Sequence, residues 1–194
     1  MHHMAALIEA EVLPRIQKPS RYLGCELNTV HKDLADVDVR FVLAFPDLYD
    51  LGLSNLGLLI LYSILNKQPG VWAERAYMPA LDLEAQLDAR HLPLFSLESK
   101  SPLRHFDAIG FTLQYELSYS NVLHMLMLSD IPLRSAQRDA DLPLIIAGGP
   151  GAFHPEPLAD FIDAFVIGDG EDVILDLVEA LRDCKGLTRD AQLR

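Results

Sequence analysis

Cysteine is scarce in this sequence, and the two cysteines that it has lie far apart. Cys25 and Cys184 form neither a CxxC pair nor a metal-type pair, so no redox or zinc motif is predicted. The first residues, Met1-His2-His3-Met4, lack the charged and apolar regions of a signal peptide. Together these features predict a protein of the reducing cytoplasm.

Positive charge is also in short supply. Sixteen Lys and Arg face 28 Asp and Glu, which gives a formal net charge of −12. Because phosphate contacts need clustered Lys and Arg, nucleic acid is not expected as a partner. Anionic membrane surfaces are excluded for the same reason. The 194 residues, half of them hydrophobic, suit one domain with a small appendage.

Several common ligand motifs are missing. The sequence has no P-loop and no GxSxG nucleophile elbow. The first predicted strand leads into Pro46-Asp47 and not into GxGxxG, and the acidic residues after Gly168-Asp169-Gly170 would repel a pyrophosphate. Thr112 and Gln114 stand where a phosphorylatable receiver domain needs an aspartate. The histidines show no paired ligand spacing, so we predict neither catalytic nor metal-ligating residues.

What the sequence does contain is a strong strand–turn–helix unit. Residues 39–45 are β-branched and aromatic, as in a buried parallel strand, and Pro46 is expected to end that strand. Residues 51–66 carry no charge and predict a helix packed on a sheet, too short and too polar to span a membrane. Open α/β sheets bind ligands where such a strand meets its helix, so residues 46–55 are predicted to belong to any small-molecule site.

The same alternation continues along the chain. Residues 1–38 are read as an N-terminal arm, 39–185 as the α/β domain, and 186–194 as a tail or the start of a linker. Short apolar strands that alternate with helices indicate a doubly wound, three-layer α/β fold with a mainly parallel five-stranded sheet. The further strands are expected at 71–77, 108–113, 142–147 and 161–167, with an edge piece at 93–95, and the further helices at 81–87, 117–128 and 171–183.

The loops that follow these strands should gather at one edge of the sheet. Gly148 and Gly149 would let a ligand approach the backbone, and helix N-termini there offer N–H groups. His154, which follows the Gly-Gly loop, is a candidate ligand contact. The alternative reading is that these glycines only end strands tightly.

These loops resemble those of the cobalamin-binding domain, which has a flavodoxin-like sheet and the pattern DxHxxG, SxL and GG. Here the first element is Asp47-Leu48-Tyr49-Asp50-Leu51-Gly52, with Tyr49 at the position of the cobalt-ligating histidine. The second is Thr112-Leu113-Gln114, and the third is Gly148-Gly149. The resemblance implies a cobalamin tail against Gly148 and Gly149, with Ser54 and Thr112 as hydrogen-bond donors and Tyr49 facing cobalt.

A wider resemblance covers nearly the whole chain. The sequence resembles the N-terminal region of cobalamin-binding-domain radical S-adenosylmethionine (radical SAM) proteins, and the arm at 21–28 resembles an uncharacterised subgroup of them. The other pieces that carry this likeness are Phe45-Pro46-Asp47, residues 52–57, 110–116, 148–150 and 163–171. In that family a following barrel holds a [4Fe–4S] cluster and S-adenosylmethionine through a CxxxCxxC loop. Two cysteines cannot supply those three thiolates, so the resemblance implies a cluster-bearing catalytic partner domain, in cis or in trans.

Two functions stay open at this point. In the first, the domain orients cobalamin for chemistry done by the cluster-bearing domain, and the candidate contacts are Asp47, Tyr49, Gly52, Ser54, Thr112, Gln114, Gly148, Gly149 and His154. In the second, it is a degenerate docking or substrate-presenting module that binds no cofactor. A third alternative is a flavin or nucleotide domain, which a yellow chromophore bound after purification would identify.

Overall fold

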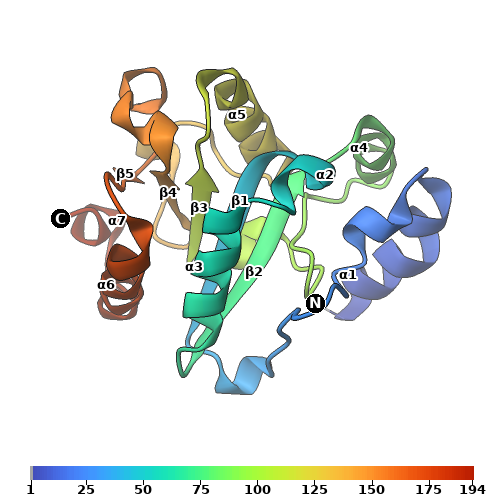
Figure 1. The fold of residues 1–194 in the computed structure, drawn as a ribbon, viewed down its shortest axis with the longest axis horizontal. Helices are drawn as coiled ribbons and strands as arrows, with labels where there is room; N and C mark the ends of the chain where they lie inside the picture. The colour runs from blue at the N-terminus through green and yellow to red at the C-terminus, as the bar shows by residue number, and fades with distance from the viewer. Residues whose placement is uncertain (1) are drawn as a thin grey trace.

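The structure, a computed structural model, describes residues 2–194 and the side chains of residues 3–194. Its centre is a five-stranded sheet in the order β2-β1-β3-β4-β5, with every neighbouring pair parallel (Figure 1). The strands are β1 (Val39–Leu48), β2 (Val71–Met78), β3 (Ala108–Thr112), β4 (Leu144–Gly148) and β5 (Ala164–Phe165). The predicted doubly wound α/β fold is confirmed, and the sheet is parallel throughout.

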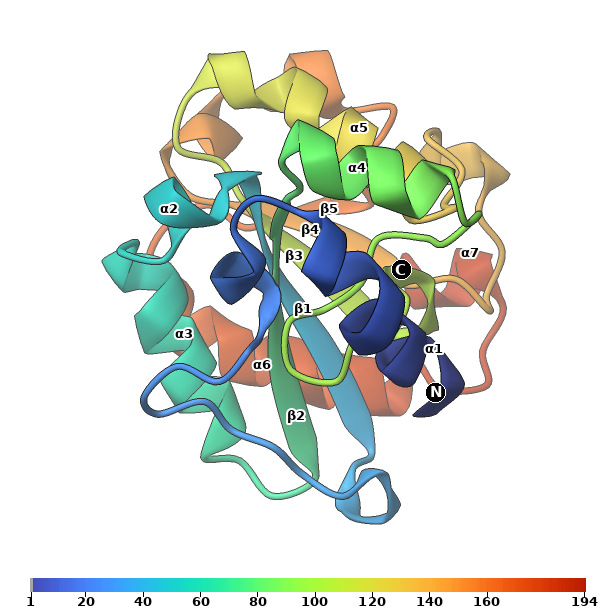
Figure 2. The same ribbon diagram turned by 90° about the vertical axis from the view of Figure 1, so that its right-hand side faces the viewer.

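Helices cover both faces of the sheet. Figure 2 shows α3 and α6 on one side and α4 and α5 on the other. The helices are α1 (His2–Leu7), α2 (Tyr49–Gly52), α3 (Leu56–Asn66), α4 (Leu81–Asp88), α5 (Tyr119–Leu128), α6 (Gly170–Asp183) and α7 (Arg189–Gln192). Within residues 2–194, no helix combines the length and the apolar character that crossing a bilayer requires.

Three predicted boundaries are wrong. β1 runs through Pro46 to Leu48 because its pairing with β2 shifts register between Phe45 and Leu48, and a proline without an N–H fits such an irregularity. The long helix expected at 51–66 is split, since Asn55 caps a new helix by accepting a hydrogen bond from the Leu58 amide at 2.9 Å. The strand expected at 161–167 is only two residues long.

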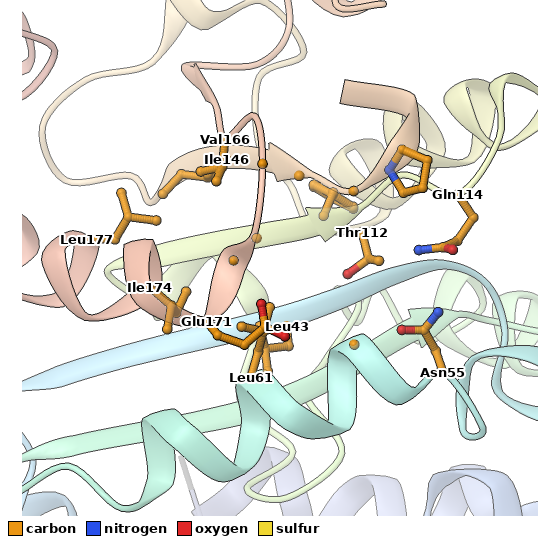
Figure 3. A pocket seen from close by; sticks show the side chains of 18 of the residues that line it. Leu43, Asn55, Leu61, Thr112, Gln114, Ile146, Val166, Glu171, Ile174 and Leu177 are labelled. Carbon is orange, nitrogen blue, oxygen red and sulfur yellow. The ribbon is translucent and has the colours of Figure 1, made fainter. Parts of the chain in front are cut away.

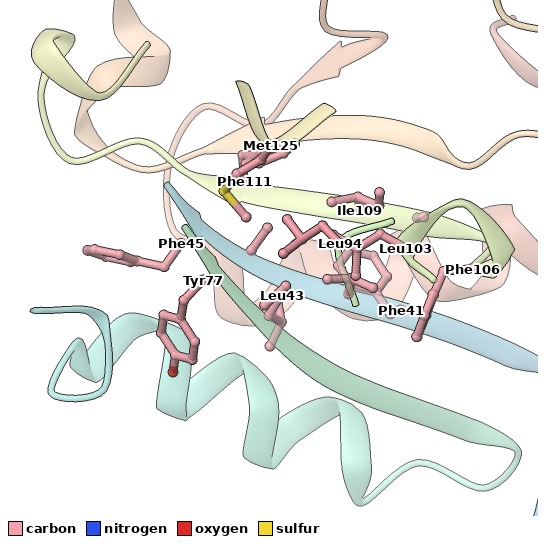
Figure 4. Packing of buried hydrophobic residues seen from close by; sticks show 14 of the residues in the cluster. Phe41, Leu43, Phe45, Tyr77, Leu94, Leu103, Phe106, Ile109, Phe111 and Met125 are labelled. Carbon is pink, nitrogen blue, oxygen red and sulfur yellow. The ribbon is translucent and has the colours of Figure 1, made fainter. Parts of the chain in front are cut away.

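Large apolar side chains fill both faces of the sheet. Figure 4 shows Phe111 and Ile109 with Met125 of α5 on one face, and Leu43 and Tyr77 on the other. These five side chains are at most 3% exposed. Each such burial contributes roughly 1.5–3 kcal/mol relative to exposure, and this apolar packing holds the helices in place.

The outer edge of β2 is closed by residues 95–101. The Leu97 amide donates to the Arg75 carbonyl at 2.8 Å, and the Glu98 carboxylate accepts from the Arg75 backbone N–H (2.8 Å) and Nε (2.7 Å). The edge strand predicted at 93–95 is wrong: this piece does not join the sheet, and Phe95 only forms an isolated antiparallel bridge with Pro102. The backbone N–H and C=O of Arg75, which face outward at this edge, are thereby satisfied.

The arm at residues 2–38 packs on the domain near β2 (blue in Figure 2). Its Tyr22 hydroxyl accepts a hydrogen bond from the Ala80 amide at 3.0 Å, and its Val30 amide donates to the Tyr62 hydroxyl at 2.9 Å. A Cβ on Gly24 would lie 2.1 Å from a backbone oxygen of residue 97, so only glycine fits this contact. The domain boundaries at 38/39 and 185/186 stay a prediction.

A buried ion cluster joins the C-terminal segments. Asp163 accepts from Arg138 Nη2 at 3.0 Å and from Arg189 Nη2, in α7, at 2.6 Å. The Asp163 and Arg138 side chains are fully buried. Its carboxylate also accepts from the Ile145 amide at the start of β4. One carboxylate thus holds α7, β4 and the segment before β5 together.

Asp163→Ala is expected to lower the free energy of unfolding by about 3–5 kcal/mol, because it leaves buried arginine charge without its partner. Urea denaturation measures the change. Asp160→Ala is the matched control: its pair with Arg134 is 57–68% exposed, and its loss should cost less than about 1 kcal/mol. Equal small losses for both variants would show that the buried cluster does not hold these segments.

Candidate functional site

A cavity of about 280 Å³ opens at the carboxyl edge of the sheet, between α3 and α6 (Figure 3). Its floor is the face formed by β1, β3 and β4. This volume lies just below the range of small-ligand pockets, which span roughly 300–1,000 Å³. The predicted meeting of loops at one edge is therefore accompanied by a real hollow.

The inner part of the cavity is apolar. Leu61 of α3 faces Ile174 and Leu177 of α6 across it in Figure 3. Gly110 packs against the Phe41 ring, and a Cβ there would lie 2.9 Å from that ring, so the floor has no room for a side chain at this position. The remaining apolar lining comes from Phe41, Leu43, Ile146 and Val166. A flat, uncharged ring system matches this interior.

The mouth combines glycine backbone with neutral polar side chains. Asn55, Thr112 and Gln114 lie together at one end in Figure 3. Within the described chain, the Thr112 hydroxyl and the Gln114 amide make no hydrogen bond, so both can bind a ligand. The backbone contribution comes from Gly57, Gly148, Gly149, Gly168 and Gly170.

The charge at the mouth is negative. Glu171 lines the cavity, and no Lys or Arg does. Exposed acidic side chains follow β3, β4 and β5, namely Glu116, Glu156, Asp169 and Asp172. A pyrophosphate would meet repulsion and no cationic partner, which disfavours dinucleotides and flavin dinucleotides here.

Four of the nine predicted contact residues line the cavity: Thr112, Gln114, Gly148 and Gly149. Two others point to different partners. Asp47 accepts a hydrogen bond from the Tyr115 hydroxyl at 2.7 Å, and this bond raises the pKa of Tyr115. The Tyr49 hydroxyl donates to Glu26 Oε1 at 2.7 Å. The site that was drawn from the sequence is thus only partly assembled.

The last three predicted residues also lie outside the cavity lining. Gly52 packs on Tyr77, where a Cβ would lie 2.5 Å from a ring carbon. The Ser54 hydroxyl donates weakly to the Leu51 carbonyl at 3.4 Å. His154 is exposed, and its carbonyl accepts from the Tyr119 hydroxyl at 3.3 Å. Whether any of them touches a ligand stays a prediction.

Sequence reasoning missed the helical walls. Leu61, Ile174 and Leu177 were read only as apolar positions of core helices. Asn55 lies at the end of the predicted stretch 46–55 and does line the cavity, but its role as a helix cap was not predicted. An Asn before an uncharged apolar run is typical of a helix N-cap, so the start of α3 at Asn55 could have been predicted from the sequence. Within the described residues, no group of three or more His, Cys, Asp or Glu is placed to hold a metal ion.

Comparison with known proteins gives two matches. The family described as radical SAM proteins, N-terminal, matches residues 57–194, well over half of the chain. An uncharacterized protein of Methanocaldococcus jannaschii is 30% identical over 97 residues, which cover 48% of this chain and 20% of that protein. The match thus spans a small part of this longer relative. No solved structure matches the chain.

Gly149 and Gly148 are expected to respond differently to alanine. Gly149 has φ +91° and ψ −177°, a region that is essentially glycine-only, and a Cβ would lie 2.8 Å from the Leu113 carbonyl oxygen. Gly149→Ala should therefore cost about 1–3 kcal/mol of stability. At Gly148 the nearest atoms lie at 3.8 Å, so Gly148→Ala should be nearly neutral. Equal thermal-unfolding temperatures for both variants would contradict the strain at Gly149.

Proposed function

This chain belongs to the family of radical SAM protein N-terminal domains, and from that premise we propose that its cavity binds the nucleotide tail of a cobalamin. The observation that carries the proposal is the apolar hollow between α3 and α6 with its glycine-lined mouth. A cobalamin tail ends in a flat, largely apolar benzimidazole base and is joined to the corrin through a ribose and a single phosphodiester. That distribution of apolar and polar groups matches the cavity and its mouth.

The apolar and the polar lining residues would contact different parts of the cobalamin tail. Leu61, Ile174 and Leu177 would shield the base from water. Thr112 and Gln114 would hydrogen-bond the ribose and the phosphodiester, whose single charge meets less repulsion at this acidic mouth than the two charges of a pyrophosphate. The backbone at Gly148 and Gly149 leaves room for the bulk of the corrin. Cobalamin, when bound, supplies methyl-carrying chemistry that protein side chains lack. The domain contributes orientation and shielding.

Tyr49 does not fit the role of an axial cobalt ligand. Its hydroxyl is committed to Glu26, and burial, followed by that hydrogen bond, raises the pKa of its phenol. A neutral phenol in this setting is a poor replacement for an imidazole. The proposed site therefore holds the tail without a protein ligand from this position.

The second candidate function, a docking module, is favoured by a separate observation. Large apolar side chains stand exposed in the segments that follow the strands: Leu51 (58%), Leu56 (69%), Leu117 (84%), Phe153 (62%) and Ile167 (52%). Such a surface suits contact with a protein partner. We propose a cluster-bearing radical SAM catalytic domain as that partner, which would bring the [4Fe–4S] cluster and S-adenosylmethionine. The two functions are compatible with each other.

Equilibrium titration with hydroxocobalamin, followed by desalting, tests the tail site. We expect retained corrin absorbance at one equivalent per chain. Cobinamide, which lacks the base and ribose, is the matched ligand control. It should bind at least about tenfold more weakly, because burying an aromatic-sized apolar group is worth about 1.5–3 kcal/mol. Equal affinity for the two corrinoids, or no binding of either, would rule the tail site out.

Gly170→Leu is expected to block the cavity without unfolding the domain. A Cβ at this first residue of α6 points at Leu61 across the hollow, with its nearest contact at 3.5 Å. Leucine there should weaken hydroxocobalamin binding at least about tenfold, and stability should hold since leucine favours helix more than glycine does. Ala180→Leu, on the exposed side of the same helix, should bind like wild type. Unchanged binding by the Gly170 variant would place the ligand elsewhere.

A further inference from the structure

One of the contacts between the arm and the turn that follows β1 runs through the carboxylate of Glu26. Glu26 Oε1 accepts from the Tyr49 hydroxyl at 2.7 Å, and Oε2 accepts from Arg75 Nη2 at 2.8 Å. Arg75 is itself fixed on the far side by Glu98 at 2.7 Å. Burial alone would raise the pKa of Glu26, but the Tyr49 hydrogen bond and the Arg75 charge lower it below its ordinary value. The carboxylate is therefore ionised and held on both oxygens.

Tyr49 is the first residue of α2, so this contact fixes the whole turn. Its ring meets the Tyr77 ring edge-on, with centroids 5.3 Å apart. At the other end of α2, Gly52 lies against the same Tyr77 ring without space for a Cβ. A second arm residue, Arg21, binds Asp50 of α2 at 2.6 Å. The turn is thus clasped between the arm and β2.

The α2 turn also positions Asn55, which lies in one wall of the cavity. The Asn55 amide donates to the Gly52 carbonyl at 3.0 Å, and Asn55 is both the cap of α3 and a lining residue of the mouth. A continuous line of contacts therefore runs from Glu26 through Tyr49 and Gly52 to Asn55. The arm and α2 both precede residues 57–194, to which the family match extends.

We propose that Glu26 is a positioning residue of the site: it holds Tyr49 and α2 so that Asn55 and the start of α3 form the cavity wall. The N-terminal arm is then part of the frame of the site. The effect on ligand affinity rests on the proposed cobalamin function, whereas the effect on the wall itself does not. The hydrogen bond from the Tyr49 hydroxyl to Glu26 connects the arm to the turn.

We call the hydrogen bond between Glu26 and Tyr49 the clamp. Amide hydrogen exchange of the full chain without ligand tests it. Glu26→Ala and Tyr49→Phe each remove the hydrogen bond, and Tyr49→Phe keeps the ring packing. In both variants, the amides of residues 51–59 should exchange at least about tenfold faster, since a hydrogen bond to a charged group is lost. The double variant should be no faster than the faster single variant, because both act through one contact. Asp36→Ala, an exposed arm carboxylate, should leave these rates unchanged.

Hydroxocobalamin affinity is measured on the same proteins. If the tail site is right, affinity falls in both clamp variants by a similar factor and holds in Asp36→Ala. Failure of wild type to bind cobalamin would remove the proposed function and leave the exchange rates to decide the clamp. Unchanged exchange at residues 51–59 in Tyr49→Phe, or a double variant whose rate increase is the product of the single ones, would overturn the clamp.

Discussion

Strand β1 pairs with β2 along one edge and with β3 along the other, both in parallel. The chain runs from β1 through α3 to β2, and α3 lies on one face of the sheet, whereas α5, the helix that follows β3, lies on the opposite face. The helices that follow β1 and β3 therefore diverge. Diverging loops leave a crevice at the carboxyl ends of the strands, where open α/β sheets bind their ligands. On the face that carries α3 and α6, β3 is not covered by the helix that follows it, because α5 packs on the other face. The cavity lies over this part of the sheet. Everything inferred about function depends on that pairing.

Strand β2 also carries two buried charged residues, Glu74 and Arg75. Glu74 is fully buried and Arg75 is 3% exposed, on opposite faces of β2. Glu74 accepts from Arg40 Nη2 at 2.5 Å, while Arg75 binds Glu98 and Glu26. Charges at such depth are tolerated only when paired and hydrogen-bonded. Two of the partners come from the arm and from the segment that closes the β2 edge, so these peripheral pieces are needed for the integrity of the sheet.

Local patterns were enough to predict the architecture. The apolar run at 39–45 and the Gly148-Gly149 turn identified buried parallel strands and the edge at which they end. Four of the predicted post-strand residues line the cavity there, and whether they bind a ligand stays a prediction. The errors have physical causes. Pro46 remains in β1 because the register slips around it, and a polar Asn55 begins a new helix because its side chain caps one.

The positions of Tyr49 and the helical walls were beyond sequence reasoning. The partner of Tyr49 is Glu26, 23 residues away, and nothing local to either residue signals the contact. Leu61 and Ile174 lie on different helices, and only the packing of α3 against α6 over the sheet turns two ordinary apolar positions into the sides of a cavity. Tertiary contacts of this kind decide whether a matching motif becomes a site.

The most direct test of the tail site is the electron paramagnetic resonance spectrum of the chain bound to cobalamin in its Co(II) form. With the base inserted between α3 and α6, its nitrogen would lie away from cobalt, and Tyr49, whose hydroxyl donates to Glu26, would supply no nitrogen in its place. The spectrum should then lack the hyperfine splitting that an axial nitrogen imposes. A nitrogen splitting that is unchanged when the protein is labelled with 15N would mean that the base remains on cobalt, and this result would contradict a tail bound in this cavity.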